Sequence, residues 1–200
     1  MLIATIITYN DWPLIKSTIE SIKDKVDKII VIDGRYRDFP GKCNTSTDGT
    51  LEYLNTIDNA RVICVAGFDE LGKRNEYLKH VKDGDTIINI DSDEVFHGDM
   101  CELKSDFGII NLHDKRHIQD RASRFFKFRE GMEYRHVHFT FYYNDKQINT
   151  LYKVINPEFS FERISSFYFE HEWYKRDEVR RYNKELYYKK LRKAEAGFPR

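Results

Sequence analysis

The sequence predicts an α/β fold, with a mostly parallel central sheet that has helices on both faces. Short apolar runs, typical of strands covered on both sides, recur through the first hundred residues. Between them lie segments whose apolar residues follow helical spacing. Polar and acidic residues directly follow several of the runs, where the carboxyl ends of parallel strands would lie. This alternation predicts right-handed strand-helix-strand units.

The chain has 200 residues, which suits one α/β domain with an ample core. We expect residues 1–100 to form a first half of this domain, residues 101–172 a second half and residues 173–200 a basic helical tail. The chain shows no basic leader and no apolar run of membrane-spanning length, which predicts a cytoplasmic protein. Three widely spaced cysteines favour neither a disulfide framework nor a thiolate metal site.

Charge is balanced overall, with 33 basic and 33 acidic residues, but it is unevenly distributed. Residues 173–200 hold ten Lys or Arg and four Asp or Glu, a net charge of +6, so the preceding chain carries −6. This balance argues against nucleic-acid binding, which needs a broad basic face. The basic helix is compatible with peripheral contact to an anionic membrane, but a solvated helix explains it more simply.

The first strand is predicted over residues 2–8, and a helix follows. Asp11, before Trp12 and Pro13, is expected to cap that helix. Its apolar stripe would be Leu14, Ile15, Thr18, Ile19 and Ile22. A second strand is expected over residues 26–32, followed by Asp33-Gly34. The alternation then continues with a helix from residue 50, a strand at 61–65, a helix at 68–81 interrupted by Gly72, and a strand at 86–90.

The fourth strand ends in the pentad Asn89-Ile90-Asp91-Ser92-Asp93. If the strand alternation continued, Asp91 and Asp93 would point the same way. At about 5 Å and an effective dielectric constant of about 20, two such charges repel by about 3 kcal/mol. A bare carboxylate pair at the end of an apolar strand is therefore unfavourable, and a divalent cation would remove the conflict.

After Phe96 the sequence changes to strand-like runs separated by charged turns, with no convincing helix between them. Strands are expected at residues 107–112, 124–128, 134–143 and 149–155, so this half should be antiparallel or mixed. Residues 176–193 predict a C-terminal helix. Its expected inner face is Val179, Tyr182, Leu186 and Leu191.

Five motifs together resemble family 2 glycosyltransferases with the GT-A fold. In order, they are residues 3–10, 29–34, 46–50, 73–75 and 91–93. The resemblance covers the first hundred residues well and the rest loosely. It implies the GT-A fold and transfer of a sugar from a nucleotide-diphosphate-sugar donor to an acceptor hydroxyl, with inversion at the sugar. The residues do not specify whether the acceptor is a glycan, a protein or a lipid.

The resemblance also implies how the donor is held. It assigns Thr8, Tyr9, Asn10 and Asp33 to the base and ribose of the nucleotide. Arg74 would lie beside the donor, where a guanidinium can fork onto phosphate or fix a neighbouring aspartate. Taken alone, Asp33 would be an ordinary turn residue before glycine, and residues 73–75 an exposed charged helix face.

Asp91 and Asp93 match the metal signature of the family, in which Mg²⁺ or Mn²⁺ bridges the protein and the donor diphosphate. Hard oxygen ligands suit these ions. By the same resemblance, Asp91 would also face the ribose. His171 resembles a histidine that precedes the last helix in relatives and serves as a further ligand. A hydrogen-bonded structural histidine is the simpler alternative for His171.

The general base is not assigned by the resemblance, because Phe139 stands where some family members carry glutamate. Asp145 and Asp120 are the candidate catalytic substitutes. For each of them taken individually, ordinary structural chemistry is the better explanation, since Asn-Asp turns are common in hairpins.

Two other functions remain open. A sugar-phosphate nucleotidyltransferase also pairs aspartates with a metal, but it would carry a glycine-rich basic loop where this chain has Tyr9-Asn10-Asp11. A non-catalytic nucleotide or glycan binding module on the same fold would explain the missing glutamate. Turnover of a donor would separate the enzyme from the module.

Overall fold

The computed structural model describes residues 1–115, 117–136, 140–150 and 152–196. The strands are β1 (Leu2–Thr8), β2 (Lys28–Asp33), β3 (Ala60–Cys64), β4 (Thr86–Asn89), β5 (Glu94–Gly98), β6 (Phe107–His113), β7 (Ile118–Lys127), β8 (Met132–His136), β9 (Thr140–Tyr143), β10 (Lys146–Gln147) and β11 (Phe161–His171). The helices are α1 (Leu14–Ile22), α2 (Thr50–Leu54), α3 (Glu70–Leu78) and α4 (Glu178–Ala196), with single 3₁₀ turns η1 (Lys23–Lys25) and η2 (Trp173–Lys175).

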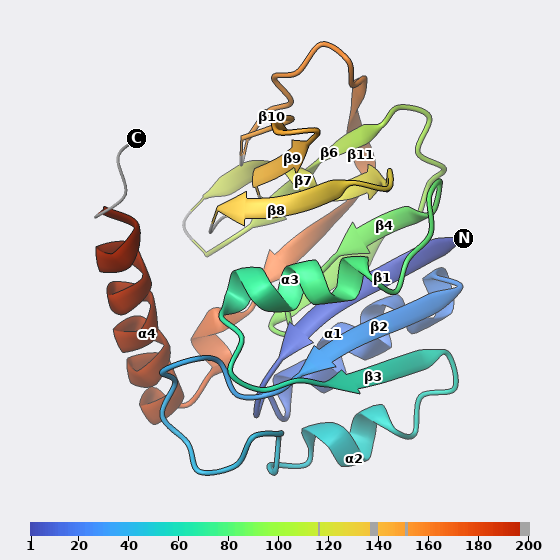
Figure 1. Cartoon of the computed structure of the whole chain (residues 1–200). Coiled ribbons are helices and arrows are strands. Elements are labelled where there is room, and N and C mark those ends of the chain that lie inside the picture. Colours follow the sequence, from blue (N-terminus) through green and yellow to red (C-terminus); the bar gives the residue numbers. More distant parts are fainter. Residues whose placement is uncertain (116, 137–139, 151, 197–200) are drawn as a thin grey trace.

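Eight strands form one mixed sheet in the order β3-β2-β1-β4-β7-β6-β11-β5 (Figure 1). In the first half, β1 pairs in parallel with β2 and β4, and β2 with β3. The expected parallel alternation is therefore observed. In the second half, β7 is antiparallel to β4 and β6, whereas β6 and β11 are parallel. That half is mixed, as the sequence predicted, and its strands continue the sheet of the first half.

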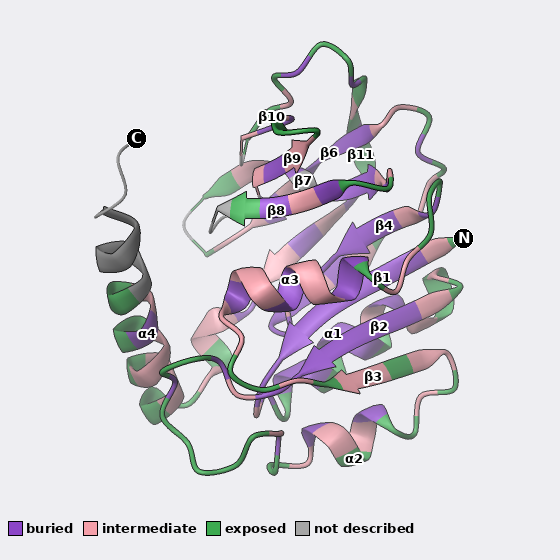
Figure 2. Cartoon of the chain, in the orientation of Figure 1, coloured by how far each residue is buried: buried purple, intermediate pink, exposed green. Residues whose placement is uncertain are grey.

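Both faces of the sheet are covered. One core contains the apolar stripe of α1, and all five residues predicted for that stripe are buried. The other core lies under α3 and under a second, three-stranded sheet of β8, β9 and β10 (Figure 1). The central strands are buried along most of their length (Figure 2). Helices thus cover both faces of the first half, whereas strands replace a helix over one face of the second.

Several elements differ from the sequence-based expectation. Strands β5 and β11 were not predicted, because charged residues interrupt their apolar pattern. Gly72 lies inside α3 without interrupting it. The run expected at 149–155 contributes only an isolated bridge between Asn149 and Val154. The single strand expected at 134–143 is divided between β8 and β9, and residues 137–139 lie outside the described residues.

The prediction for the inner face of α4 is wrong. Val179, Tyr182 and Leu186 are 69%, 62% and 37% exposed, and the side chain of Leu191 is not described. Tyr187 is instead the buried apolar residue, packed against the rings of Tyr36 and Phe39. The rest of the inward face is polar, so apolar spacing could not identify it. Among the described residues, no helix combines the length and apolar character needed to cross a membrane.

Gly34, at the end of β2, tests how tightly the strand ends are packed. Its φ is +144°, and a Cβ there would lie 1.7 Å from the carbonyl oxygen of Val65. We expect Gly34→Ala to lower the free energy of unfolding by about 3 kcal/mol or more, because backbone must move. Gly67→Ala is the control: its φ is +79° with no atom within 4 Å of the added carbon. Denaturant unfolding should show a loss of about 1–2 kcal/mol there. Equal losses would contradict this account.

Candidate functional site

The carboxyl ends of β1, β2 and β4 lie side by side at one edge of the sheet. Thr8 is in register with Asp33 on β2, and Thr5 is in register with Asn89 on β4. The polar segments that follow these strands therefore meet at this edge. Ligands of parallel sheets bind outside such strand ends.

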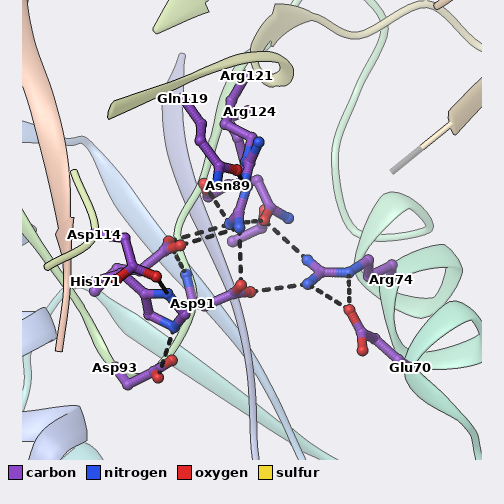
Figure 3. A network of polar contacts seen from close by, with 12 residues as sticks. Glu70, Arg74, Asn89, Asp91, Asp93, Asp114, Gln119, Arg121, Arg124 and His171 are labelled. Carbon is purple, nitrogen blue, oxygen red and sulfur yellow. Dashed lines mark hydrogen bonds and ion pairs between the residues drawn. The ribbon is translucent and has the colours of Figure 1, made fainter. Parts of the chain in front are cut away.

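Asp91 is held between two arginines from different elements (Figure 3). Arg74 of α3 lies 2.8 Å from Oδ1, and Arg124 of β7 lies 2.8 Å from Oδ2. The same arginines also bind Glu70 and Glu94, each at 3.0 Å. Burial alone would raise the pKa of Asp91, but Arg124 and Arg74 outweigh it and hold this pKa well below its usual range. The two arginines thus favour the ionised form of Asp91.

Asn89 completes this network. Its Oδ1 accepts hydrogen bonds from Nη1 of Arg74 at 2.9 Å and from Nη1 of Arg124 at 3.1 Å. Its amide donates to Thr5 and Tyr77. The sequence analysis assigned no role to Asn89. A fully buried amide at the end of an apolar run was the available signal, since such a group must find partners.

Asp93 has a separate set of partners. Its Oδ2 lies 3.0 Å from Nε2 of His171 and 2.6 Å from Nη2 of Arg176. Burial would raise its pKa, but Arg176, Lys184 and His171 keep this pKa well below its ordinary value. Asp91 and Asp93 follow β4 in a turn rather than on a strand, so strand alternation does not set their directions. The structure brings Asp93 and His171 together, as expected, but Asp91 turns to the arginines.

These residues test whether a divalent cation fits. No group of three or more His, Cys, Asp or Glu side chains within the described ranges is placed to hold a metal ion. Asp91 already accepts from two guanidinium groups, and Asp93 is in contact with Arg176 and His171. In this arrangement arginines occupy the positions from which a metal would bind, so the residues do not fit an Mg²⁺ or Mn²⁺ ion. Metal use remains a prediction from the resemblance.

The residues expected to hold the nucleoside connect the strand ends to the loop before α2. Asp33 accepts hydrogen bonds from both the backbone and the side chain of Ser46. The backbone amide of Asn10 donates to the same hydroxyl at 2.7 Å. The hydroxyl of Tyr9 donates to the carbonyl of Cys43 at 2.9 Å, and Thr8 donates to Asp11 at 2.9 Å. These side chains lie together at the predicted edge and order its loop.

Lys73, next to Arg74, is fully buried between β1 and β2. Its ammonium donates to the carbonyl of Thr8 at 2.7 Å and to that of Gly34, and it lies 3.8 Å from the ring centroid of Tyr36. Burial lowers the pKa of Lys73 to about 7, although Asp33 opposes this shift. The motif of residues 73–75 is therefore a buried cluster and not an exposed helix face.

Asp11 is a residue whose role the sequence analysis missed. It was expected to cap α1, but no side-chain cap is present there. Its carboxylate instead accepts from Thr8, from Ser92 at 2.7 Å and from Arg180 of α4 at 2.5 Å. Burial would raise its pKa, but Arg180, Lys184 and Arg176 lower it to about 2. Asp11 thus links β1, the turn after β4 and α4.

The two candidate bases have partners elsewhere. Asp120 on β7 makes a two-pronged ion pair with Arg163, both distances being 2.8 Å. Asp145, in the turn between β9 and β10, is 86% exposed at its side chain and pairs with Arg135. Neither arginine belongs to the network around Asp91. The position of Phe139 lies outside the described residues, so the base remains unassigned.

A pocket opens beside Asp91, between the strand ends and α4. Its volume is about 240 Å³ with the open solvent at its mouth included. It is lined by Ile7, Tyr36, Glu70, Arg74, Asp91, Ser92, Lys184 and Tyr188. Two carboxylates, Glu70 and Asp91, and two cations, Arg74 and Lys184, therefore share the lining of this pocket.

No protein-family model matches this chain, and no curated protein matches it. Among solved structures, the chain is similar to crystal structures of S. aureus TarS. The complex of TarS 1–349 with UDP-GlcNAc is 21% identical, with a TM-score of 0.44, and the match covers 56% of this chain and 34% of that chain. The complex with UDP is 22% identical, also with a TM-score of 0.44, over 56% and 36%.

A crystal structure of TarS with no range stated is 22% identical, with a TM-score of 0.44, over 58% of this chain and 22% of that chain. The chain therefore spans about a third or less of the length of the proteins it matches. This likeness is too distant to assign an activity.

The arginine network can be tested by removing Arg124. We expect Arg124→Met to lower the free energy of unfolding by about 3–5 kcal/mol, because Asp91 and the buried Glu94 lose a shared cation. Arg163→Met is the matched control, since Arg163 is 67% exposed and its pair with Asp120 should contribute at most about 1 kcal/mol. Urea unfolding compares the two variants. Similar losses would show that Arg124 is not a structural cation of the site.

The acidic pH range tests Asp11. Its folded pKa of about 2 lies below the ordinary 3.8, so its stabilising effect is complete above pH 3.8 and is lost as pH falls toward 2. Asp11→Asn should therefore be less stable than the unaltered protein by about 2 kcal/mol near pH 6. The difference should close between pH 4 and pH 2 in urea unfolding series. A difference that stayed constant over this interval would contradict the ion pair with Arg180.

Proposed function

We propose that this protein is a glycosyltransferase that uses a nucleotide-diphosphate-sugar donor. The observation that carries the proposal is that the five motifs of the resemblance form one connected set of hydrogen bonds at the edge of the sheet. The loop motif joins the first two through Ser46, which contacts Asp33 and Asn10. The helix motif joins them through Lys73, and it reaches the last motif through the pair of Arg74 and Asp91.

The chemistry suits the pocket beside Asp91. In the transfer, the acceptor oxygen forms a bond to the anomeric carbon while the bond from that carbon to the diphosphate breaks. The electron pair stays on the diphosphate, and the acceptor proton is released. Negative charge therefore grows on the leaving group, and fixed cations beside it stabilise the transition state. Arg74 and Lys184 line the pocket and are suited to this role.

The residues around Asp93 would act by positioning. Asp93 is 2% exposed, and it contacts His171 and Arg176, which precede α4 in the chain. α4 is the helix that lines the pocket. Asp93 can affect the rate of transfer without contacting the donor, because a cation misplaced by about 1 Å can reduce a rate about 100-fold. The nucleoside would lie toward Tyr9 and Asp33, as the resemblance implies.

Activity can be tested with UDP-, GDP- and dTDP-sugars and with saccharide, peptide and lipid-linked acceptors. We expect release of the nucleoside diphosphate from at least one donor. Asp93→Asn should reduce this release about 100-fold, because His171 and Arg176 lose their anchor. Asp99→Asn, a change at an exposed aspartate on the same segment, should leave it unchanged. Circular dichroism checks that both variants are folded.

A binding module on the same fold is the second candidate. It is favoured by the two candidate bases, since Asp120 and Asp145 are both paired with arginines outside the site. A donor that raises the melting temperature without being turned over would support the module. If no donor either stabilises the protein or is consumed, both functions are excluded.

A further inference from the structure

The cations on α4 and just before it face the strand ends. Arg180 and Lys184 are four residues apart on α4, so they lie one above the other on the same side of the helix. Arg176 precedes the helix and has an extended backbone. Arg176 contacts Asp93, and Arg180 contacts Asp11. Lys184 lines the pocket with Arg74. α4 stands beside the ends toward which β1 and β2 point (Figure 1). We call these three residues the cationic stripe.

The carboxylates of the site have cationic partners, whereas part of the stripe does not. Asp11, Asp91 and Asp93 each pair with at least one arginine. Lys184, by contrast, makes no hydrogen bond or ion pair within the described chain. Nε of Arg176 is buried without a hydrogen-bond acceptor there, whereas Nη2 makes an ion pair with Asp93. The side chain of Arg176 is only 8% exposed. Buried donors of this kind call for a ligand that accepts hydrogen bonds.

The charges around Lys184 also favour an anionic ligand over a divalent cation. Burial lowers the pKa of Lys184, and the nearby Arg176 lowers it further, whereas Asp93 and Asp11 partly offset the shift. A divalent cation entering here would have to displace arginines from carboxylates. An anion with several oxygens would instead accept hydrogen bonds from Lys184 and from Nε of Arg176.

We propose that the cationic stripe, with Arg74, binds the diphosphate of the donor and stabilises it as it leaves, without a divalent ion. This proposal rests on the proposed function and specifies how its donor is held. Lys184 is the residue that reaches the pocket with no carboxylate partner of its own, so it is the contact most available to phosphate oxygens. α4 forms one wall of the pocket, through Lys184 and Tyr188.

Isothermal titration calorimetry with UDP and with GDP tests the proposal, in EDTA and in Mn²⁺. We expect at least one nucleoside diphosphate to bind in EDTA, with an affinity that Mn²⁺ changes by less than about threefold. Lys184→Met should weaken this binding about tenfold or more, the effect of losing a hydrogen bond from a charged group. Lys184→Arg, which keeps the charge, should remain within about threefold of the unaltered protein.

Lys190→Met is the matched control, because Lys190 is an exposed lysine on the same helix. It should leave the affinity unchanged, and circular dichroism verifies that each variant is folded. Binding that occurs only with Mn²⁺, or that Lys184→Met does not weaken, overturns the cationic stripe but leaves the proposed function intact. If neither nucleoside diphosphate binds in either buffer, the proposed function fails, and this inference fails with it.

Discussion

The fold of the site depends on two arginines that neutralise the buried negative charge of Asp91. An ionised carboxylate at the end of an apolar strand is very unfavourable unless it is paired and hydrogen-bonded. α3 supplies Arg74, and its orientation is fixed by Asp69, which caps the helix through the amide of Gly72. β7 supplies Arg124, which lies one residue beyond the antiparallel pair of Ile88 and Phe125. For both arginines to reach Asp91, α3, β7 and the turn after β4 must therefore pack against one another.

This constraint explains why the two halves of the chain share one sheet. Because Arg124 comes from the second half, the charges of the first half are satisfied only when β7 pairs with β4. β5, from the first half, then pairs with β11 at the far edge. β11 ends in His171, which returns to Asp93. The polar site and the hydrogen-bond register of the sheet thus specify each other.

The parallel half could be predicted from sequence because its signals are local. Its apolar runs are short and continuous, and α1 has an unbroken apolar stripe. Strand β11 could not be predicted, since charged and serine residues interrupt its apolar pattern and four of its eleven residues are exposed. Within the site, the sequence located Asp91, Asp93 and His171, and it indicated Arg74 as a group able to fix a neighbouring aspartate, but it did not identify Arg124 or Arg176. These two arginines come from β7 and from the segment before α4, and such long-range pairing leaves no trace in residue spacing.

The error in α4 shows why the site had to be found in three dimensions. A helix usually buries its apolar stripe, and spacing therefore favoured Val179, Tyr182 and Leu186. The helix instead turns Arg180, Lys184 and Tyr188 inward, because buried carboxylates at the strand ends attract cations more strongly than a small apolar stripe is driven from water. A helix oriented by charge rather than by apolar burial is positioned by the site itself. Its cations are then placed where a polyanionic ligand would meet them.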